Sequence, residues 1–296
     1  MKRNPRGKLW IGTSGWSYPD WRGIVYPRRT SRAFKPLSFL SRFVNAVEVN
    51  TSFYRLPTAR MTAKWPQQTP PGFRFAFKLT KSLTHQRAAV PDPAEARKFI
   101  AALEPVRDAG KLGPVLLQFP WSFRYSGENA EYLLRLSESV NDVERAIEVR
   151  HASWEAGAAQ QLLASCGAAC SIDQPPLPGN LGPAPCVAQS TGYVRLHGRN
   201  SAAWFAEDVP AYERYNYLYD ERELREWVTR IEAMQEQSRS VYVFTNNHYR
   251  GQALANALEL RAMLAGERVA VPQDLARTYP QLAQVARPAA EPTLFD

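Results

Sequence analysis

Glu148, Arg150 and His151 are the residues whose types and spacing are best suited to chemistry. A carboxylate can exchange a proton, a guanidinium can hold an oxyanion through two parallel hydrogen bonds, and an imidazole can carry a proton near neutral pH. Ile147 and Val149 alternate with Glu148 and Arg150, and this period of two predicts a β-strand with one apolar and one polar face. We therefore expect the strand to present these polar side chains to a pocket.

Polar side chains recur in the same way along other strand-like segments. If the apolar residues of each strand pack outward, the alternation assigns the inward residues. These are Glu48, Asn50, Lys78, Gln118, Glu148, Arg150, Asp173, Arg195, His197 and Asn246. Ionisable groups are costly to bury without partners, so this concentration predicts a ligand site. The alternative is an ion-pair network of Glu148, Arg150 and Arg195 that only orders the core.

The elements that must position these residues form a regular series. Strands are predicted at residues 9–14, 46–50, 73–78, 114–119, 145–150, 168–173, 192–198 and 241–247. Helices are predicted between and after them, at 36–43, 59–67, 91–109, 128–139, 153–165, 220–237 and 250–265. Such a series of βα units predicts an α/β fold, a single (β/α)₈ TIM barrel with its active site at the C-terminal strand ends. A doubly wound sheet is the alternative.

Two long segments follow the sixth and seventh predicted strands. Residues 174–190 are rich in Pro and Gly and replace most of the sixth helix, whereas residues 199–219 are rich in aromatic residues. Long loops in compact domains are often functional. We expect Trp204 of the second segment, with Trp16 and Tyr18 after the first strand, to wall the substrate. Packing over the barrel mouth is the alternative.

The histidines add proton carriers to the same end of the barrel. His85, His151, His197 and His248 each lie at or just after a predicted strand end. Taken singly, each is typical of a hydrogen-bonded packing residue, but together they are expected to crowd one rim. His151 and His197 are predicted to carry protons or to bind a metal ion.

The inward residues are best explained by hydrolase or lyase chemistry on a phosphate-containing substrate, with nucleic acid as one option. Glu48 and Glu148 are predicted to act as acids, bases or metal ligands, and Asp173 is a third catalytic carboxylate. The predicted substrate- and anion-binding residues are Lys78, Arg150, Arg195, Asn50, Gln118 and Asn246. Arg and Lys hold phosphate oxygens while His or Glu moves a proton.

Other chemistries stay open. Carboxylates with His suit a divalent metal that activates water, but no dense ligand spacing occurs in the sequence, so the cofactor is left unknown. Glu48 and Glu148 would make a glycosidase if they lay about 5–9 Å apart. A non-catalytic protein that binds nucleic acid or the sliding clamp of replication would need its positive charge on a continuous outer face.

Composition bounds the partners and the compartment. A net charge of +9 favours an anionic small molecule or nucleic acid over a membrane. Three cysteines give no disulfide framework, and no signal peptide or apolar span is found, which suits the cytoplasm. The expected organisation is a flexible N-terminus at 1–7, a barrel at 8–286 and a flexible tail at 287–296. Thr293, Leu294 and Phe295 in that tail resemble a clamp-docking peptide.

Several motifs together carry a family resemblance. They are IGTSGWSY at 11–18, EVNTSFY at 48–54, LQFP at 117–120, EVRHASW at 148–154, VRLHGR at 194–199 and FTNN at 244–247. The chain closely resembles the bacterial and archaeal family called domain of unknown function 72, or YecE-like, from about residue 8 to 265. The resemblance implies a TIM barrel. It implies no reaction and no catalytic residues, because the family is defined by an unknown function.

Overall fold

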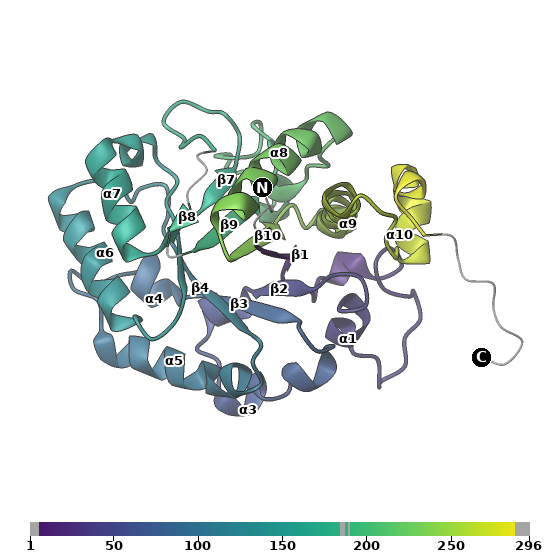
Figure 1. Ribbon diagram of the computed structural model, residues 1–296, viewed down its shortest axis with the longest axis horizontal. Coiled ribbons are helices and arrows are strands. Elements are labelled where there is room, and N and C mark those ends of the chain that lie inside the picture. Colours follow the sequence, from purple (N-terminus) through teal and green to yellow (C-terminus); the bar gives the residue numbers. More distant parts are fainter. Residues whose placement is uncertain (1–5, 184–186, 189, 288–296) are drawn as a thin grey trace, which may run out of the picture.

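A ring of parallel strands with helices around it forms the centre of the protein (Figure 1). The computed structural model describes residues 6–183, 187–188 and 190–287. Its strands are β1 Lys8–Ser14, β2 Ala46–Val49, β3 Arg74–Lys78, β4 Leu112–Gln118, β5 Arg145–Glu148, β6 Ala168–Ala169, β7 Ser171–Asp173, β8 Val187–Ala188, β9 Thr191–Leu196 and β10 Ser240–Thr245. β1 pairs in parallel with both β2 and β10, so the first and last of these strands are neighbours.

The predicted sixth strand closes the ring although it is split in two. β6 pairs with β5 and β7 pairs with β9, and only Cys170 separates the two halves. The Cys170 amide donates to the Ile147 carbonyl at 2.8 Å, and the His197 amide donates to the Asp173 carbonyl at 2.9 Å. One split strand therefore joins both ends of the sheet, and the predicted TIM barrel is confirmed. β8 adds an antiparallel pair to β9.

Helices cover the outside of the barrel (Figure 1). The α-helices of the described ranges, including α2 at the cavity end of the barrel, are α1 Pro36–Leu40, α2 Thr51–Tyr54, α3 Ala59–Thr62, α4 Lys81–Thr84, α5 Pro93–Asp108, α6 Gly127–Ser139, α7 Gly157–Cys166, α8 Glu221–Gln237, α9 Gln252–Ala265 and α10 Gln273–Thr278. The short helices α2 and α4 were not predicted. Between β7 and β9 the described residues contain no helix, as the Pro- and Gly-rich composition predicted. No helix in the described ranges is long and apolar enough to cross a membrane.

Local sequence explains where the main helices begin and which faces they bury. α8 begins with a capping box: Asp220 accepts from the Glu223 amide at 2.8 Å, and Glu223 accepts from the Asp220 amide at 3.0 Å. Its apolar stripe, which includes Trp227 and Ile231, is buried. α9 is buried on most sides because it packs between α8 and the β1–β10 strands.

Several parts of the expected organisation lie outside the described residues. These are positions 1–5 of the N-terminus, Cys186 and residues 288–296, which include Thr293, Leu294 and Phe295. Cys166 and Cys170 are both buried. Beyond α9 the described chain forms α10 and then a 3-10 helix at Pro280–Gln284.

Gly12 in β1 is required by a close approach of two strands. A methyl carbon added to Gly12 would lie 1.7 Å from the carbonyl oxygen of Ala46 in β2. We expect Gly12→Ala to lower the free energy of unfolding by about 3 kcal/mol or more, because backbone in the barrel wall must move. Gly127→Ala is the matched control, since nothing lies within 4 Å of its added carbon. Urea denaturation of both variants checks this, and equal midpoints would contradict it.

Candidate active site

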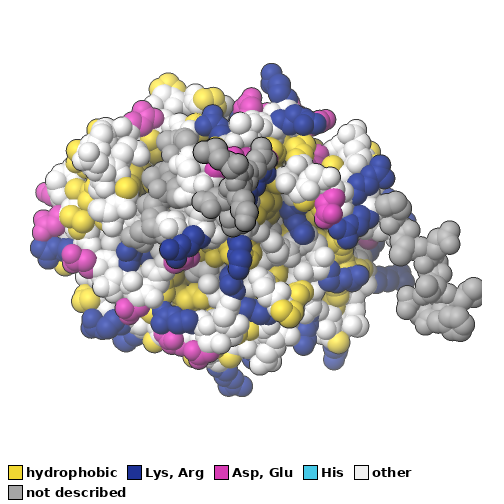
Figure 2. Space-filling model, viewed as in Figure 1, with side chains coloured by type: hydrophobic (Ala, Val, Ile, Leu, Met, Phe, Trp, Pro, Cys, Tyr) yellow, Lys and Arg dark blue, Asp and Glu magenta, His cyan; other side chains and the backbone are white. Residues whose placement is uncertain are grey.

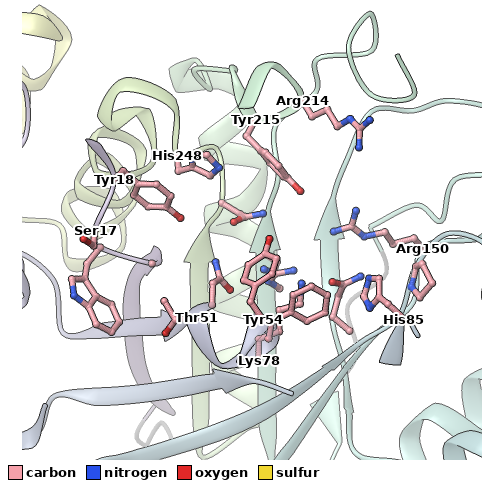
Figure 3. Close-up of a pocket in the computed structure, with 18 of the residues that line it drawn as sticks. Ser17, Tyr18, Thr51, Tyr54, Lys78, His85, Arg150, Arg214, Tyr215 and His248 are labelled. Atoms are coloured by element: carbon pink, nitrogen blue, oxygen red, sulfur yellow. The ribbon is translucent and has the colours of Figure 1, made fainter. Parts of the chain in front are cut away.

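A cavity of about 710 Å³ opens at the C-terminal ends of the barrel strands (Figure 3). Six of the predicted inward residues line it, each at or just beyond the end of a different strand. They are Asn50, Lys78, Gln118, Arg150, Arg195 and Asn246. Trp16, Tyr18 and Trp204 also line the cavity, as predicted for the wall. Strand parity therefore placed these six candidates around one space, and the wall candidates from the loops lie around the same space.

Beneath this cavity, Arg195 joins two buried carboxylates. Its Nη2 lies 2.7 Å from Oε1 of Glu48, and its Nη1 lies 2.5 Å from Oε2 of Glu148. The side chains of both glutamates are 0 % exposed. Glu48 also accepts hydrogen bonds from Ser14 Oγ at 2.6 Å and from Tyr193 Oη at 2.8 Å. A single guanidinium from β9 thus holds carboxylates from β2 and β5.

Glu148 has two further neighbours at the edge of the cavity floor. Arg150 Nε donates to its Oε1 at 2.8 Å, and His197 Nε2 lies 3.3 Å from the same oxygen. Burial alone would raise the pKa of Glu148, but Arg195, His197 and Arg150 together hold it well below its usual range. Burial lowers the pKa of His197 to about 3, so this imidazole is neutral. The Asn246 amide lies 3.0 Å from its Nδ1.

Glu48, Glu148 and His197 were expected to face the cavity, but the structure places all three below its floor. None of them is among the lining residues, and each has a relative exposure of 0 %. They lie close together, as the parity required, but their polar atoms are directed to Arg195, Arg150 and one another. The arrangement corresponds to the buried ion-pair network that the sequence left as an alternative.

Asp173 lies on the opposite side of the barrel wall from the one predicted. Ile172 stands beside the inward Arg195 in the β7–β9 register, so Ile172 faces the axis and Asp173 faces outward. There Asp173 accepts from Arg199 Nη2 at 2.8 Å and from the indole Nε1 of Trp227 in α8 at 2.7 Å. The assumption that apolar residues point outward fails in this strand, and Asp173 is a link between barrel and helix.

His151 was predicted to carry protons or to bind a metal ion, but in the structure it makes structural contacts. Its Nδ1 accepts from the Ser153 amide at 3.0 Å, which caps the 3-10 helix Ala152–Glu155. Its ring packs edge-on against Trp121 with centroids 4.7 Å apart. His151 does not line the cavity, whereas His85 and His248, which were noted only as rim histidines, do.

The charged residues that line the cavity are all cations among the described residues: Lys78, Arg150, Arg195 and Arg214. Burial, reinforced by Arg195, lowers the pKa of Lys78 to about 7. Burial also lowers the pKa of His85 to about 4, so its ring is neutral at pH 7. Figure 3 shows Lys78, His85 and Arg150 along the lower part of the cavity, with Arg214 above them.

Aromatic rings form most of the remaining wall. Tyr18 stacks on His248 with centroids 4.4 Å apart, and Trp204 lies under the Arg150 guanidinium at 5.6 Å. Burial lowers the pKa of His248 to about 4. The Lys78 ammonium packs over the ring of Phe53 in α2, 3.7 Å from the ring centroid. The lining rings that were not singled out are Phe53, Tyr54, Trp65, Trp121, Phe205 and Tyr215.

A metal site does not fit the donors that are present. The residues that the structure describes contain no group of three or more His, Cys, Asp and Glu side chains placed to hold an ion. The lining of the cavity offers only two imidazoles, and the nearby carboxylates are committed to Arg195 and Arg150. No catalytic step is therefore assigned to a metal.

Comparison with known proteins gives a family over most of the chain. Residues 10–282 match the model described as "Protein of unknown function DUF72". UPF0759 protein YunF of Bacillus subtilis (strain 168) is 32% identical over 86% of this chain and 94% of its own. UPF0759 protein YecE of Escherichia coli (strain K12) is 30% identical over 39% of each chain.

Solved structures agree with this match. A DUF72 family protein from Thermotoga maritima MSB8 shares 34% identity, with a TM-score of 0.76 over 87% of this chain and 99% of that one. A DUF72 family protein from Enterococcus faecalis V583 shares 25% identity, with a TM-score of 0.77 over 87% and 95%. The resemblance read from the sequence motifs is confirmed, and the chain belongs to the DUF72 family of proteins of unknown function.

Proposed function

We propose that the protein is an enzyme that binds a small substrate with a phosphate or similar oxyanion and a planar part, and acts on it as a hydrolase or lyase. One observation carries the proposal: the charged side chains lining the cavity are cations, within the described residues, while the carboxylates below are already ion-paired. A cavity of about 710 Å³ lies within the range of small-molecule sites.

Donors for an oxyanion are available at the floor. Arg150 uses its Nε for Glu148, and its side chain is 17 % exposed, so the terminal nitrogens can meet a ligand. The buried Nε of Arg195 has no hydrogen-bond partner among the described residues. A buried donor without a partner costs free energy that a ligand oxygen would recover. Arg150 and Arg195 therefore support a charge-assisted grip on phosphate.

The aromatic wall supports a planar part in the substrate. Trp16, Tyr18 and Trp204 surround the space above the cations. Aromatic faces favour flat groups such as nucleobases and sugar rings. A nucleotide-sized ligand fits this combination, because a cavity of about 710 Å³ has the size of a small-molecule site. On the face in Figure 2, Lys and Arg side chains lie among Asp and Glu side chains.

The proton carriers in this proposal are His85 and Lys78, in place of the buried glutamates. His85 is a neutral base at pH 7 and lines the cavity. A glycosidase would need a protonated acid and a second carboxylate at the substrate. Glu148 is held ionised, and neither Glu48 nor Glu148 reaches the cavity, so the glycosidase alternative is not favoured.

Phosphate recognition can be tested by comparing nucleoside 5′-monophosphates and sugar phosphates with their unphosphorylated parents in calorimetry. We expect only the phosphorylated members to bind. Arg150→Gln should weaken binding about 10- to 150-fold, since it removes charge-assisted hydrogen bonds worth about 1.5–3 kcal/mol. Arg135→Gln, on the outer face of α6, is the matched control. Equal binding of phosphorylated and parent compounds would refute the anion site.

The charge of Lys78 gives the site a pH dependence of known sign. Below pH 7 the ammonium is charged and attracts an anion, and above pH 7 that attraction is lost, because the pKa of Lys78 is about 7. We expect the affinity for 4-nitrophenyl sulfate, whose own charge is constant, to fall several-fold between pH 6 and 9. Fluorescence titration measures this. Lys78→Gln should flatten the profile, and a flat profile in the unaltered protein would contradict the assignment.

A further inference from the structure

Lys78 is partly buried, and its amine has no polar partner among the described residues. In the described residues, no hydrogen bond or ion pair is made by its Nζ, which lies 3.7 Å from the centroid of the Phe53 ring. Lys111 is the internal contrast: its Nζ donates to the Pro66 carbonyl at 2.8 Å and to Thr69 at 2.7 and 2.9 Å. Lys111 is held as a structural cation, whereas Lys78 is left free at the cavity.

The carboxylates that could have paired with Lys78 are already occupied. Glu48 and Glu148 both accept from Arg195, and Glu148 also accepts from Arg150. The charged groups facing Lys78 thus comprise two guanidiniums and two carboxylates, with neutral His85 beside them. The positive and negative charges nearly cancel, so burial is the main influence on the pKa of the Lys78 amine. A substantial fraction of Lys78 is therefore unprotonated at neutral pH, with a pKa of about 7.

An unprotonated lysine amine in an apolar setting is a nucleophile toward carbonyl carbon. The position of Lys78 also suits this role, because it ends β3 and is held by strand pairing on both sides of that strand. Rigid strand ends hold reacting groups more precisely than loops do. The carboxylates of Glu48 and Glu148 are the other nucleophiles near this position. Neither residue lines the cavity, so a substrate cannot reach them.

We propose that Lys78 forms a Schiff base with a carbonyl group of an oxyanion-bearing substrate held by Arg150 and Arg195. This rests on the proposed function and narrows its substrate class to phosphorylated or similarly charged aldehydes and ketones, handled by a lyase. The geometry points to it through three features: a lysine amine with no partner, cations beside it for the oxyanion, and carboxylates that are already paired.

The step balances without any co-reactant. The Nζ lone pair attacks the carbonyl carbon, and the C=O π pair moves to oxygen. A proton then passes from nitrogen to that oxygen to give a carbinolamine. Loss of the hydroxyl group as water, with uptake of one proton, leaves a protonated imine, and hydrolysis reverses the sequence. His85, whose ring lies 4.8 Å from that of Phe53, is a neutral base in the lining that can take part in these proton transfers.

The experiment uses pyridoxal 5′-phosphate, an aromatic aldehyde with a phosphate, followed by borohydride reduction and peptide mass spectrometry of the full chain. We expect Lys78 to be labelled at least tenfold faster than any other lysine, with a rate that is half-maximal near pH 7. Pyridoxal without its phosphate should react at least tenfold more slowly. Lys111 should stay unlabelled, and Lys98, at an exposed position of α5, reports general lysine reactivity; Lys98→Arg is the matched control.

The outcomes distinguish failure of the Lys78 nucleophile from failure of the anion site. The Schiff-base proposal would be overturned if Lys78 stayed unlabelled, or if it were labelled only above pH 9 like an ordinary lysine. If 4-nitrophenyl sulfate still binds in that case, the anion site stands and only the nucleophile fails. If Lys78 is labelled equally fast by pyridoxal and the sulfate does not compete, the nucleophile stands and the anion site fails. Because the map is made on the unaltered protein, a poorly folded Lys78→Met variant would not affect the result.

Discussion

The bridge of Glu48, Arg195 and Glu148 is the interaction on which the interior of the barrel depends. It joins β2, β9 and β5 through side chains that are almost completely buried. Charges removed from water require close partners, and removal of one member of such a set leaves an uncompensated charge. The bridge therefore fixes the relative positions of strands on different sides of the barrel and makes the floor of the cavity rigid.

The same bridge determines what the cavity can do. Because Arg195 and Arg150 neutralise the two buried carboxylates, the positive excess in the lining of the cavity comes from Lys78 and Arg214. Carboxylates at this end of the barrel would otherwise be the obvious acids and bases. In this protein the carboxylates hold cations in place, and the charged and titratable groups that line the cavity include an amine, guanidiniums and imidazoles.

Alternation and order along the chain were sufficient to predict the barrel and six strand-end residues that surround the cavity. The error at Asp173 arose because parity needs to know which face of a strand is outward, and Ile172 turns its apolar side chain to the axis. Phe53 was missed as a wall residue because it follows its strand in the short helix α2, which has no periodic signal. His85, which directly follows α4, was expected at the rim but was not assigned to the lining. Whether an inward residue lines the cavity or lies buried below it depends on its height along the barrel axis. The alternation of a strand does not encode this height.

The split strand that closes the ring has a consequence for the solution behaviour of the protein. A sheet that closes on itself leaves no unpaired strand edge for another chain to extend, which protects it from edge-to-edge aggregation. At this seam, however, only β6 and β7, of two and three residues, maintain the closure. Loss of these few ladder hydrogen bonds would leave the edges of both β5 and β9 unpaired. Cys170 therefore marks the place where a transient opening of the closed barrel would expose two unpaired strand edges.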